Sequence, residues 1–540
     1  MLVGGAAGAV DIPTPGDPVH IDGTSTSIGA WHAPNGNFTS CDDNYGELLE
    51  RLNVSGNYGP WVVGVRLDGS LYLNTVQTPR DAMGSVPPCT SADLLSRYKN
   101  TVIPEKLWAG YNGRNVEVTV GDSYVTFGRG LSLSLRKTDQ LGIDTSNRGA
   151  RLKIDADRVS AILVAGATNI NNIDEATGRY ADDPNDLVVG GQVMNALHDG
   201  IKLGGEAVMF AFNNPVSSSV PPDTHHFEER WLNAGPIFDA PRLTDWLGVY
   251  LEGMMQQRTD VFGNTKTAWA GYGTATARFG RVTALLEGKA YGGIAIVQPQ
   301  FQAIEFQSVQ YSVAPTAERV LQPLEHTQHD IYGGRLRVDW SVVNGLTLYV
   351  NYGLFRDAQG YLNPDTSDLE AGVVHDPYVG LDWLVGRLHF QAEAGWRGVF
   401  VPKYGPPVRG DGHVDVLAVA DLGRGNSIEL HWTDLERLEV LPLANLAWRE
   451  GTIVAGYRMR PWFALNGVFD YSTEGGQEGP FKGQALSGWF PGGAAEFDIN
   501  DSSNIRVFGG ASRGGLRCVS GVCRIFPPFQ GGKATVTLRF

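Results

Sequence analysis

Residues that could bind a metal ion or activate a substrate occur in this sequence only as small, separate sets. The sets are His225-His226, the pair His326 and His329, and the acidic runs 182–186 and 498–501. Two histidines do not complete the ligand set of a zinc site, and neither acidic run has the spacing of an EF-hand calcium loop. The Gly-x-Gly at residues 128–130 does not open a strand–helix unit, which a nucleotide site would need. We therefore predict no catalytic residue, no metal and no cofactor.

Four cysteines form a second chemical set. Cys518 and Cys523 lie in one late loop. Cys41 precedes the first two predicted strands, at residues 46–59 and 61–74, and Cys89 follows them. An even number of cysteines at loop positions suits an oxidising compartment. We expect a local disulfide between Cys518 and Cys523. A disulfide between Cys41 and Cys89 is also natural, because two strands return the chain to the same side.

Charged residues of both signs fall on the polar side of alternating segments. Such charges can pair with one another and remain hydrated, and two interpretations stay open. They either support a barrel wall or set the selectivity of a pore. The candidates are Arg66, Asp68, Arg335, Arg337, Asp339 and Glu393.

The segments that carry these charges alternate apolar and polar residues, as strands in a barrel wall do. In the last eight residues, Ala534, Val536, Leu538 and Phe540 fall on one face and polar residues fall on the other. An amphipathic final strand that ends in phenylalanine resembles the C-terminal signal that the barrel-assembly machinery reads. The pattern recurs, for example over residues 61–73, 346–354 and 388–396. Several segments reach the ~9–11 residues that a tilted membrane strand needs.

The alternating segments predict an all-β fold, a transmembrane antiparallel β-barrel. Short turns and longer polar loops alternate along the chain, which is typical of such barrels. We count 23 candidate strands, including a weak one at 129–136, whereas bacterial single-chain barrels have even counts. The 214–241 loop falls on the short-turn side, which indicates an error between about residues 120 and 266. We therefore predict about 22 strands, within a range of 20–24.

Composition agrees with this fold. Charged residues make up 19% of the 540, and the apolar runs are too short for a membrane helix. The net charge of −15 disfavours nucleic-acid binding, which needs basic surface. Residues 1–10 resemble the end of a secretory signal. We predict that residues 11–45 form a periplasmic or lumenal segment and that residues 46–540 form the barrel.

One stretch resembles a known family. It runs Gly121-Asp122-Ser123-Tyr124, then Phe127-Gly128-Arg129-Gly130-Leu131, then Gly142-Ile143-Asp144 and Arg148-Gly149. This pattern is similar to that of uncharacterised outer-membrane barrels from myxobacteria and Bacteroidota, and the match covers roughly residues 45–155. The resemblance implies a barrel in the outer membrane and no known activity.

Within that stretch, the glycines predict a hinge in the chain, since glycine permits a bulge or a sharp bend. The charges that follow are unsuited to facing lipid. Our hypothesis is that residues 127–148 fold inward and narrow the lumen; the alternative is an ordinary wall strand and an outer loop. The constriction candidates are Phe127, Gly128, Arg129, Gly130, Arg136 and Asp144.

Three functions remain open from the sequence. The first is a porin-like pore or transporter for hydrophilic solutes in a Gram-negative outer membrane. The second is a scaffold barrel that houses or docks a lipoprotein, a secretion component or an electron-transfer protein. The third and least favoured is an outer-membrane enzyme. The expected partners are the lipid bilayer, the barrel-assembly machinery during biogenesis and a periplasmic or lipoprotein partner.

Overall fold

The structure is a computed structural model of the chain. It describes residues 10–14, 17–34, 43–74, 98–176, 178, 180–181, 183–213, 228–260, 263–296, 309–315, 317, 330–402, 404–442, 444–474, 488–519 and 522–540.

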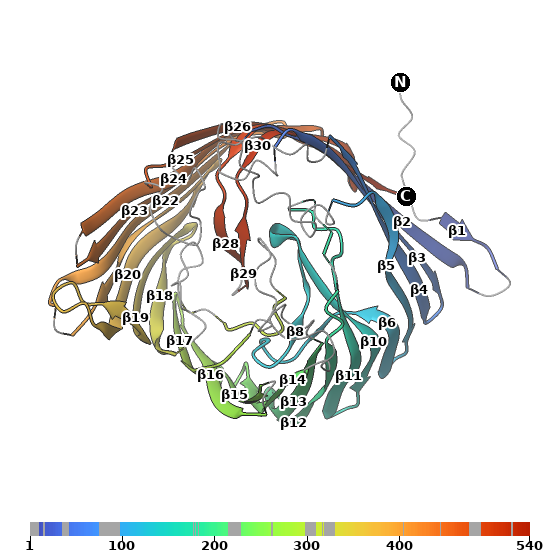
Figure 1. The fold of residues 1–540 in the computed structure, drawn as a ribbon, viewed down its shortest axis with the longest axis horizontal. Helices are drawn as coiled ribbons and strands as arrows, with labels where there is room; N and C mark the ends of the chain where they lie inside the picture. Colours follow the sequence, from blue (N-terminus) through green and yellow to red (C-terminus); the bar gives the residue numbers. More distant parts are fainter. Residues whose placement is uncertain are drawn as a thin grey trace, which may run out of the picture.

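The chain forms a closed antiparallel barrel of 24 strands, seen in Figure 1 down its axis. Each wall strand pairs with the next one, and the ring closes where the first wall strand pairs with the last, Ser27 opposite Val536. The wall strands are β2 (Val19–His32), β3 (Tyr45–Tyr58), β4 (Trp61–Leu73), β5 (Thr101–Asn112), β6 (Val116–Ser123), β10 (Ile143–Asp155), β11 (Val159–Ile170), β12 (Leu187–His198), β13 (Ile201–Asn213), β14 (Glu228–Ala240), β15 (Leu247–Thr259), β16 (Thr265–Phe279), β17 (Val282–Gly292), β18 (Ile331–Val343), β19 (Leu346–Leu362), β20 (Leu369–Val385), β21 (Leu388–Phe400), β22 (Pro407–Gly423), β23 (Asn426–Leu441), β24 (Ala444–Met459), β25 (Phe463–Ser472), β26 (Gly488–Asn500), β27 (Ser503–Ser512) and β30 (Phe529–Arg539).

Seven short elements lie outside the wall. They are β1 (Val10–Ile12), β7 (Val125–Thr126), β8 (Ser134–Leu135), β9 (Lys137–Thr138), the 3-10 helix η3 (Asp139–Leu141) and the hairpin of β28 (Gly515–Val519) and β29 (Val522–Phe526). Within the described residues, no helix has the length and apolar character needed to cross a bilayer.

Side chains alternate across the wall as the sequence predicts. On β4, Trp61 and Val63 are more than half exposed on the outer face, whereas Arg66 and Asp68 are buried on the inner face. The closed ring pairs each wall strand with both of its neighbours, although the pairing of β5 with β6 covers only residues 108–112 and 117–121. An apolar outer face around a polar interior is the surface of an outer-membrane barrel, and the outer membrane is where this chain resides.

Aromatic side chains on the outer face form two belts, which mark the membrane boundaries. One belt lies at the end where short turns join the strands, and the other lies near the long loops. The short-turn belt contains Tyr58, Trp61, Trp246, Phe279, Trp340, Trp383, Trp462, Phe497 and Phe540, and the long-loop belt contains Trp31, Trp269, Tyr332, Tyr352, Trp396 and Trp489. Short turns face the periplasm in such barrels, so the long-loop end faces outward.

The strand count of 24 lies within the predicted range, but three assignments were wrong. Residues 129–136 are no wall strand, because Leu131, Leu133 and Leu135 are fully buried inside the barrel. Residues 228–240 form the strand β14 within the predicted 214–241 loop. With this strand counted, the long loops fall at one end of the barrel and the short turns at the other, as expected. Residues 19–32, predicted to lie within a segment outside the wall, form β2. Polar Ser25 and Ser27 on the outer face of β2 hide its alternation.

A row of glycines bends the wall beside the resemblance segment. Gly149 on β10 lies directly opposite Gly121 on β6 and Gly166 on β11. A Cβ on Gly149 would lie 2.1 Å from the carbonyl oxygen of Ala165, so no larger residue fits there. Gly121 also has a φ of +100°, which L-residues with side chains rarely adopt. The three strands can therefore lean into the lumen at this row.

Several connections from the long-loop end fold into the lumen, as Figure 1 shows for β8 and for the hairpin of β28 and β29. We call the described parts of segments 124–142, 171–186, 294–296 and 309–315 the plug, and β28 with β29 the inner hairpin. Backbone bonds join the plug segments: Tyr311 N–H donates to Ile296 O at 2.9 Å, and Ser134 N–H donates to Tyr311 O at 2.7 Å. The plug segments are therefore joined into one folded core inside the lumen.

Candidate functional site

A carboxylate on the wall holds the glycine turn of the plug. The Glu252 carboxylate, from β15, accepts the backbone N–H of Arg129 at 2.7 Å and of Leu131 at 3.2 Å. The Tyr250 hydroxyl donates to the same carboxylate at 2.5 Å, and the Arg129 guanidinium lies 4.8 Å from the Tyr250 ring centroid. Each of the two oxygens of this side chain thus accepts a backbone N–H of the turn. We call this contact the latch.

The turn needs glycine for two separate reasons. Gly128 and Gly130 have φ values of +51° and +96°, in the region that glycine tolerates best. A Cβ on Gly128 would also lie 2.6 Å from a carboxylate oxygen of Glu252. The predicted glycine hinge is thus the place where the plug backbone touches the wall carboxylate most closely.

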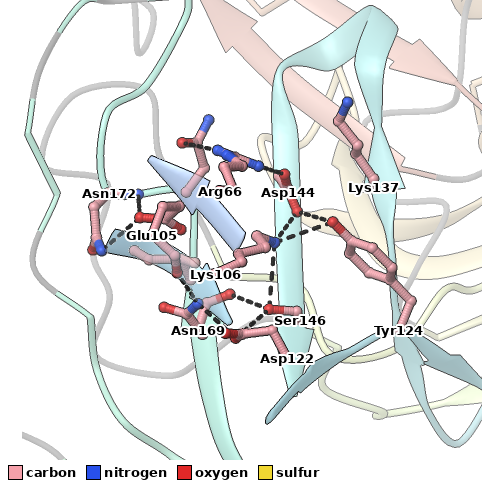
Figure 2. A network of polar contacts seen from close by, with 12 residues as sticks. Arg66, Glu105, Lys106, Asp122, Tyr124, Lys137, Asp144, Ser146, Asn169 and Asn172 are labelled. Atoms are coloured by element: carbon pink, nitrogen blue, oxygen red, sulfur yellow. Dashed lines mark hydrogen bonds and ion pairs between the residues drawn. The ribbon is translucent and has the colours of Figure 1, made fainter. Parts of the chain in front are cut away.

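The two ends of plug segment 124–142 are anchored by a buried charge network, shown in Figure 2. The ammonium of Lys106 donates to the carboxylate of Asp144, and to the hydroxyl of Tyr124 at 3.1 Å. Tyr124 in turn donates to Asp144 at 2.7 Å. Arg66 also donates to Asp144, and it holds Asp68 through two bonds of 2.7 and 2.8 Å. We call this set the root network, since it fixes the point where the plug returns to the wall.

A bulge in β5 supplies two inward charges in a row. Lys106 pairs with Arg66 and Pro104 pairs with Leu67, so Glu105 is an extra residue on its strand. A bulge lets two successive side chains share a face, and Glu105 and Lys106 are accordingly both buried, at 0% and 4% exposure.

A second polar layer joins the wall to the plug loop 171–186. Asp122 accepts the N–H of Leu107 at 2.9 Å and the amide of Asn169 at 2.7 Å. The Glu105 side chain accepts the amide of Asn172 at 2.8 Å (Figure 2). These bonds satisfy polar groups that the lumen wall and the plug bury together, which otherwise would cost free energy.

The apolar part of the plug packs against inward aromatic residues of the wall. Phe127 and Tyr311 are fully buried against Phe210, Phe212 and Trp231. The Tyr311 hydroxyl donates to the carboxyl of Asp186, which also accepts the backbone N–H of Asn213 at 2.8 Å.

Burial perturbs two acidic residues of the plug. It raises the pKa of Asp186 to about 6 and, likewise, that of Asp183 to about 6. Burial, followed by the nearby Asp186, also raises the pKa of Tyr311 well above its usual value. Both carboxyl groups therefore become protonated as the pH falls through about 6.

The inner hairpin is tied to the plug by one arginine. Arg524 of β29 donates to the backbone oxygens of Leu141 at 3.0 Å and Gly142 at 3.3 Å, and pairs with the buried carboxylate of Asp174. The last long connection of the chain thus contacts two earlier ones inside the lumen.

The lumen charges predicted on the opposite wall face inward and form pairs along the wall. Arg335 donates to Glu287 at 2.7 Å, and Arg337 pairs with Asp339 at 2.8 Å. Tyr349 donates to Glu393 at 2.9 Å across Gly380, the glycine of the strand between them. Arg66 and Asp68 belong instead to the root network.

The constriction candidates are divided between the latch and the root network. Phe127, Gly128, Arg129 and Gly130 form the turn at the latch, and Asp144 belongs to the root network. Arg136 is half-buried between them, and its carbonyl accepts the N–H of Thr145 at 3.3 Å.

Some predicted residues lie outside the described part. His225, His226, His326, His329, Cys41 and Cys89 fall there, so a Cys41–Cys89 disulfide stays a prediction. Within the described part, no group of three or more metal-binding side chains is present. The backbones of Cys518 and Cys523 lie directly opposite each other in the inner hairpin, and their disulfide also stays a prediction.

Sequence reasoning missed Glu252, Glu105, Lys106 and Asp122 as parts of the site. Two signals could have found them. Glu252 is a lone acid within an apolar strand, and Glu105-Lys106 breaks the alternation of β5 with two adjacent charges. Asp122 and Tyr124 belong to the resemblance segment, which also supplies the turn at the latch and Asp144 of the root network.

Comparison with known proteins identifies no family: no family model matches the chain, and no curated protein matches it. Solved structures of barrels do match. The siderophore receptor PirA from Pseudomonas aeruginosa has 7% identity and a TM-score of 0.46, and covers 96% of this chain and 80% of its own. The copper transporter OprC has 8% identity and a TM-score of 0.47, with 97% and 80% covered. The P pilus usher (PapC) translocation pore has 9% identity and a TM-score of 0.41, with 96% and 99% covered.

Proposed function

We propose that this chain is a gated outer-membrane transporter for hydrophilic solutes. The observation that carries the proposal is the plug, a folded core of the chain's own connections inside a wide polar barrel. The latch fixes the plug at one point and the root network fixes it at another. A solute can then pass only when the plug shifts, and the latch is the smaller of the two attachments.

The lumen wall away from the plug suits a solute that keeps its hydration. Its charges are paired along the wall, as between Arg337 and Asp339, and tyrosine hydroxyls lie among them. Paired charges and hydroxyls offer hydrogen bonds without a strong net field. The plug occupies space that an enclosed partner protein would need, which favours transport over the scaffold interpretation.

Single-channel conductance in planar bilayers tests this proposal. Thr126 and Ser134 lie directly opposite each other, so residues 127–133 can be replaced by a two-residue Asn-Gly turn without disturbing the wall. We expect the intact chain to be closed for most of the recording and the shortened chain to conduct steadily. The proposal is wrong if the shortened chain, still a folded barrel, has the conductance of the intact one.

A point variant addresses the latch alone. Glu252→Gln keeps the size of the side chain but replaces one of its two acceptor oxygens with an NH2 group, so one N–H of the turn loses its acceptor and openings should become several-fold more frequent. Glu393→Gln is the matched control, because Glu393 is a lumen carboxylate that bonds a wall tyrosine. Equal opening frequencies in the two variants would argue against the latch.

A further inference from the structure

A second carboxylate lies beside the latch on the inner face of the wall. Glu206 of β13 points into the lumen and is 5% exposed. It pairs with Gly235 on β14, and Ile237 of the same strand pairs with Glu252 on β15. Because Gly235 has no side chain, the two carboxylates can meet across β14, and they lie close enough to interact.

Glu206 has no positive partner among the residues that the structure describes. No arginine or lysine there forms an ion pair with it, and neither of its oxygens accepts a well-formed hydrogen bond. The Glu252 carboxylate differs, because the latch already gives it three donors. A buried carboxylate without a partner is very costly, so such groups are paired, bind a metal ion or become neutral.

Further oxygens around Glu206 are also unpaired. The Ser132 side chain, from the plug, is fully buried beside Glu206, and its hydroxyl makes no well-formed hydrogen bond within the described part. Asn233 of β14 donates its amide N–H to the backbone oxygen of Ser132 at 3.1 Å, while its amide oxygen stays unpaired there. Asn233 lies two residues from Gly235, so it is a diagonal neighbour of Glu206 on the inner face. The unpaired groups at this junction are thus all oxygens.

This set of oxygens matches the preference of calcium. Ca²⁺ takes about 6–8 oxygen ligands from carboxylates, amide oxygens and water, in a flexible geometry. Glu206 offers both of its oxygens. A carboxylate has about four acceptor positions, and the latch uses three of those on Glu252, so one remains. Asn233 and Ser132 each add one oxygen, and water completes the set.

Two other occupants explain less. Mg²⁺ requires a near-ideal octahedron and usually keeps several water molecules, which a junction as buried as this one does not favour. A proton shared by Glu206 and Glu252 would pair the two carboxyl groups. It would leave the oxygens of Asn233 and Ser132 as they are, whereas one Ca²⁺ accounts for all of them.

We infer that Glu206, Glu252, Asn233 and Ser132 form a calcium site between the wall and the plug. The two carboxylates balance the charge of the ion, and the other two side chains are neutral oxygen ligands, so the site contains only two acidic residues. Ser132 brings the plug into the coordination of the ion. Bound Ca²⁺ therefore ties residue 132 to β13 and β14 beside the latch. It then keeps the plug closed, a step that rests on the proposed function.

Isothermal titration of CaCl2 into the full chain, purified in detergent and first treated with a chelator, tests the site. We expect wild-type protein to bind Ca²⁺ at this site. Glu206→Gln should weaken the binding at least about tenfold, because it removes one of the two charges that hold the ion. Ser132→Ala should weaken it by a smaller factor. Glu393→Gln is the matched control, since Glu393 is a lumen carboxylate that bonds a wall tyrosine, and it should bind calcium like wild type.

Two results overturn the inference. One is a wild-type chain that binds no calcium, and the other is a Glu206→Gln chain that binds it like wild type. Infrared spectroscopy of the calcium-free chain then identifies the occupant: a protonated-carboxyl band that disappears in Glu206→Gln would show a shared proton in place of the ion. Retained heat-modifiable migration of each variant shows that the barrel has folded.

Conductance separates this inference from the proposed function. Added CaCl2 should make openings of the intact chain several-fold rarer, and it should not affect the chain in which residues 127–133 are replaced, because that chain lacks Ser132. If the shortened chain conducts like the intact one, the transporter proposal fails, while calcium binding that needs Glu206 still supports the site. If the intact chain opens and closes equally often with and without calcium, the closing role of the ion is wrong.

Discussion

Arg524 donates a hydrogen bond of 3.0 Å to the backbone oxygen of Leu141, 383 residues earlier in the chain. Two lumenal connections that are far apart in the sequence are thus joined directly. Asp174, from a third connection, receives the same guanidinium. The inner hairpin is therefore part of the interior structure, and removing its arginine should also loosen the plug.

Replacing Arg524 with Leu should loosen the inner hairpin and the plug together. Asp174 is 1% exposed, so the substitution removes the guanidinium from a buried carboxylate, at a cost of about 3–5 kcal/mol. Hydrogen exchange should increase in residues 139–142 and 171–176 as well as in the hairpin. Adding Asp174→Asn should recover part of the protection. Exchange that increases in the hairpin alone would contradict the coupling.

Lys106→Met should destabilise the barrel far more than Lys153→Met. Lys106 is 4% exposed and bonds Asp144, whereas the Lys153 side chain is 31% exposed beside Glu117 and Asp155. Breaking a buried pair costs about 3–5 kcal/mol, but an exposed pair contributes at most about 1 kcal/mol. Guanidinium unfolding in lipid vesicles measures both. Similar unfolding midpoints for the two variants would show that the root network does not act as an anchor.

Gly128→Ala should open the plug, whereas Gly280→Ala should not. Both glycines have nearly the same φ, +51° and +58°, so both substitutions carry a similar backbone penalty of about 1 kcal/mol. Only at Gly128 does the added carbon meet the Glu252 carboxylate; at Gly280 it meets nothing within 4 Å. Conductance recordings and protease sensitivity of the plug distinguish the two. If the two variants conduct alike and are cut alike, the contact between Gly128 and Glu252 does not keep the plug closed.

The plug should be more stable at pH 5 than at pH 8. Burial raises the pKa of Asp186 to about 6 from a usual value of 3.8. A raised carboxyl pKa means that the folded state binds the proton more tightly than the unfolded state. The stabilisation is fully present below about pH 4 and is lost as the pH rises through 6. Hydrogen exchange of residues 309–313 should show this trend, and Asp186→Asn should weaken it. An unchanged trend in the variant would point to another group.

Non-reduced peptide mapping should recover Cys518 and Cys523 in one disulfide. Their backbones face each other across β28 and β29. The closed loop is short, so its contribution to stability should be small, on the order of 2 kcal/mol. Recovery of either cysteine as a free thiol from oxidised outer membranes would contradict the prediction. Cys518→Ser with Cys523→Ser should keep the barrel folded.

The alternation of apolar and polar residues was sufficient to predict the barrel, because most wall strands separate lipid from a polar interior. It failed where the interior is apolar. In β14, Trp231 packs against the plug and Ile237 is buried on the same inward face, while Leu232 and Phe238 face outward, so both faces are apolar. In residues 129–136, the leucines do alternate with serines, but they face the core inside the lumen. A periodic pattern cannot tell which apolar surface a strand faces.

The candidate site was only partly predictable. The resemblance segment and its glycines drew attention to the turn at Gly128, but its contact is Glu252, more than a hundred residues away. Such a pairing depends on the strand order and on which connections turn inward. The barrel-assembly machinery and a periplasmic or lipoprotein partner stay predictions.

The closure of the ring has a kinetic consequence. Wall strands pair with neighbours in the sequence, except where Ser27 meets Val536, about 500 residues apart. Local pairs form quickly, because little chain entropy is lost in bringing them together, whereas the last pair closes the longest loop of all. Folding should therefore proceed as a growing sheet of hairpins that stays open until the final residues arrive. A chain truncated within β30 would be expected to stall as an unsealed sheet, with nearly all of its pairing complete.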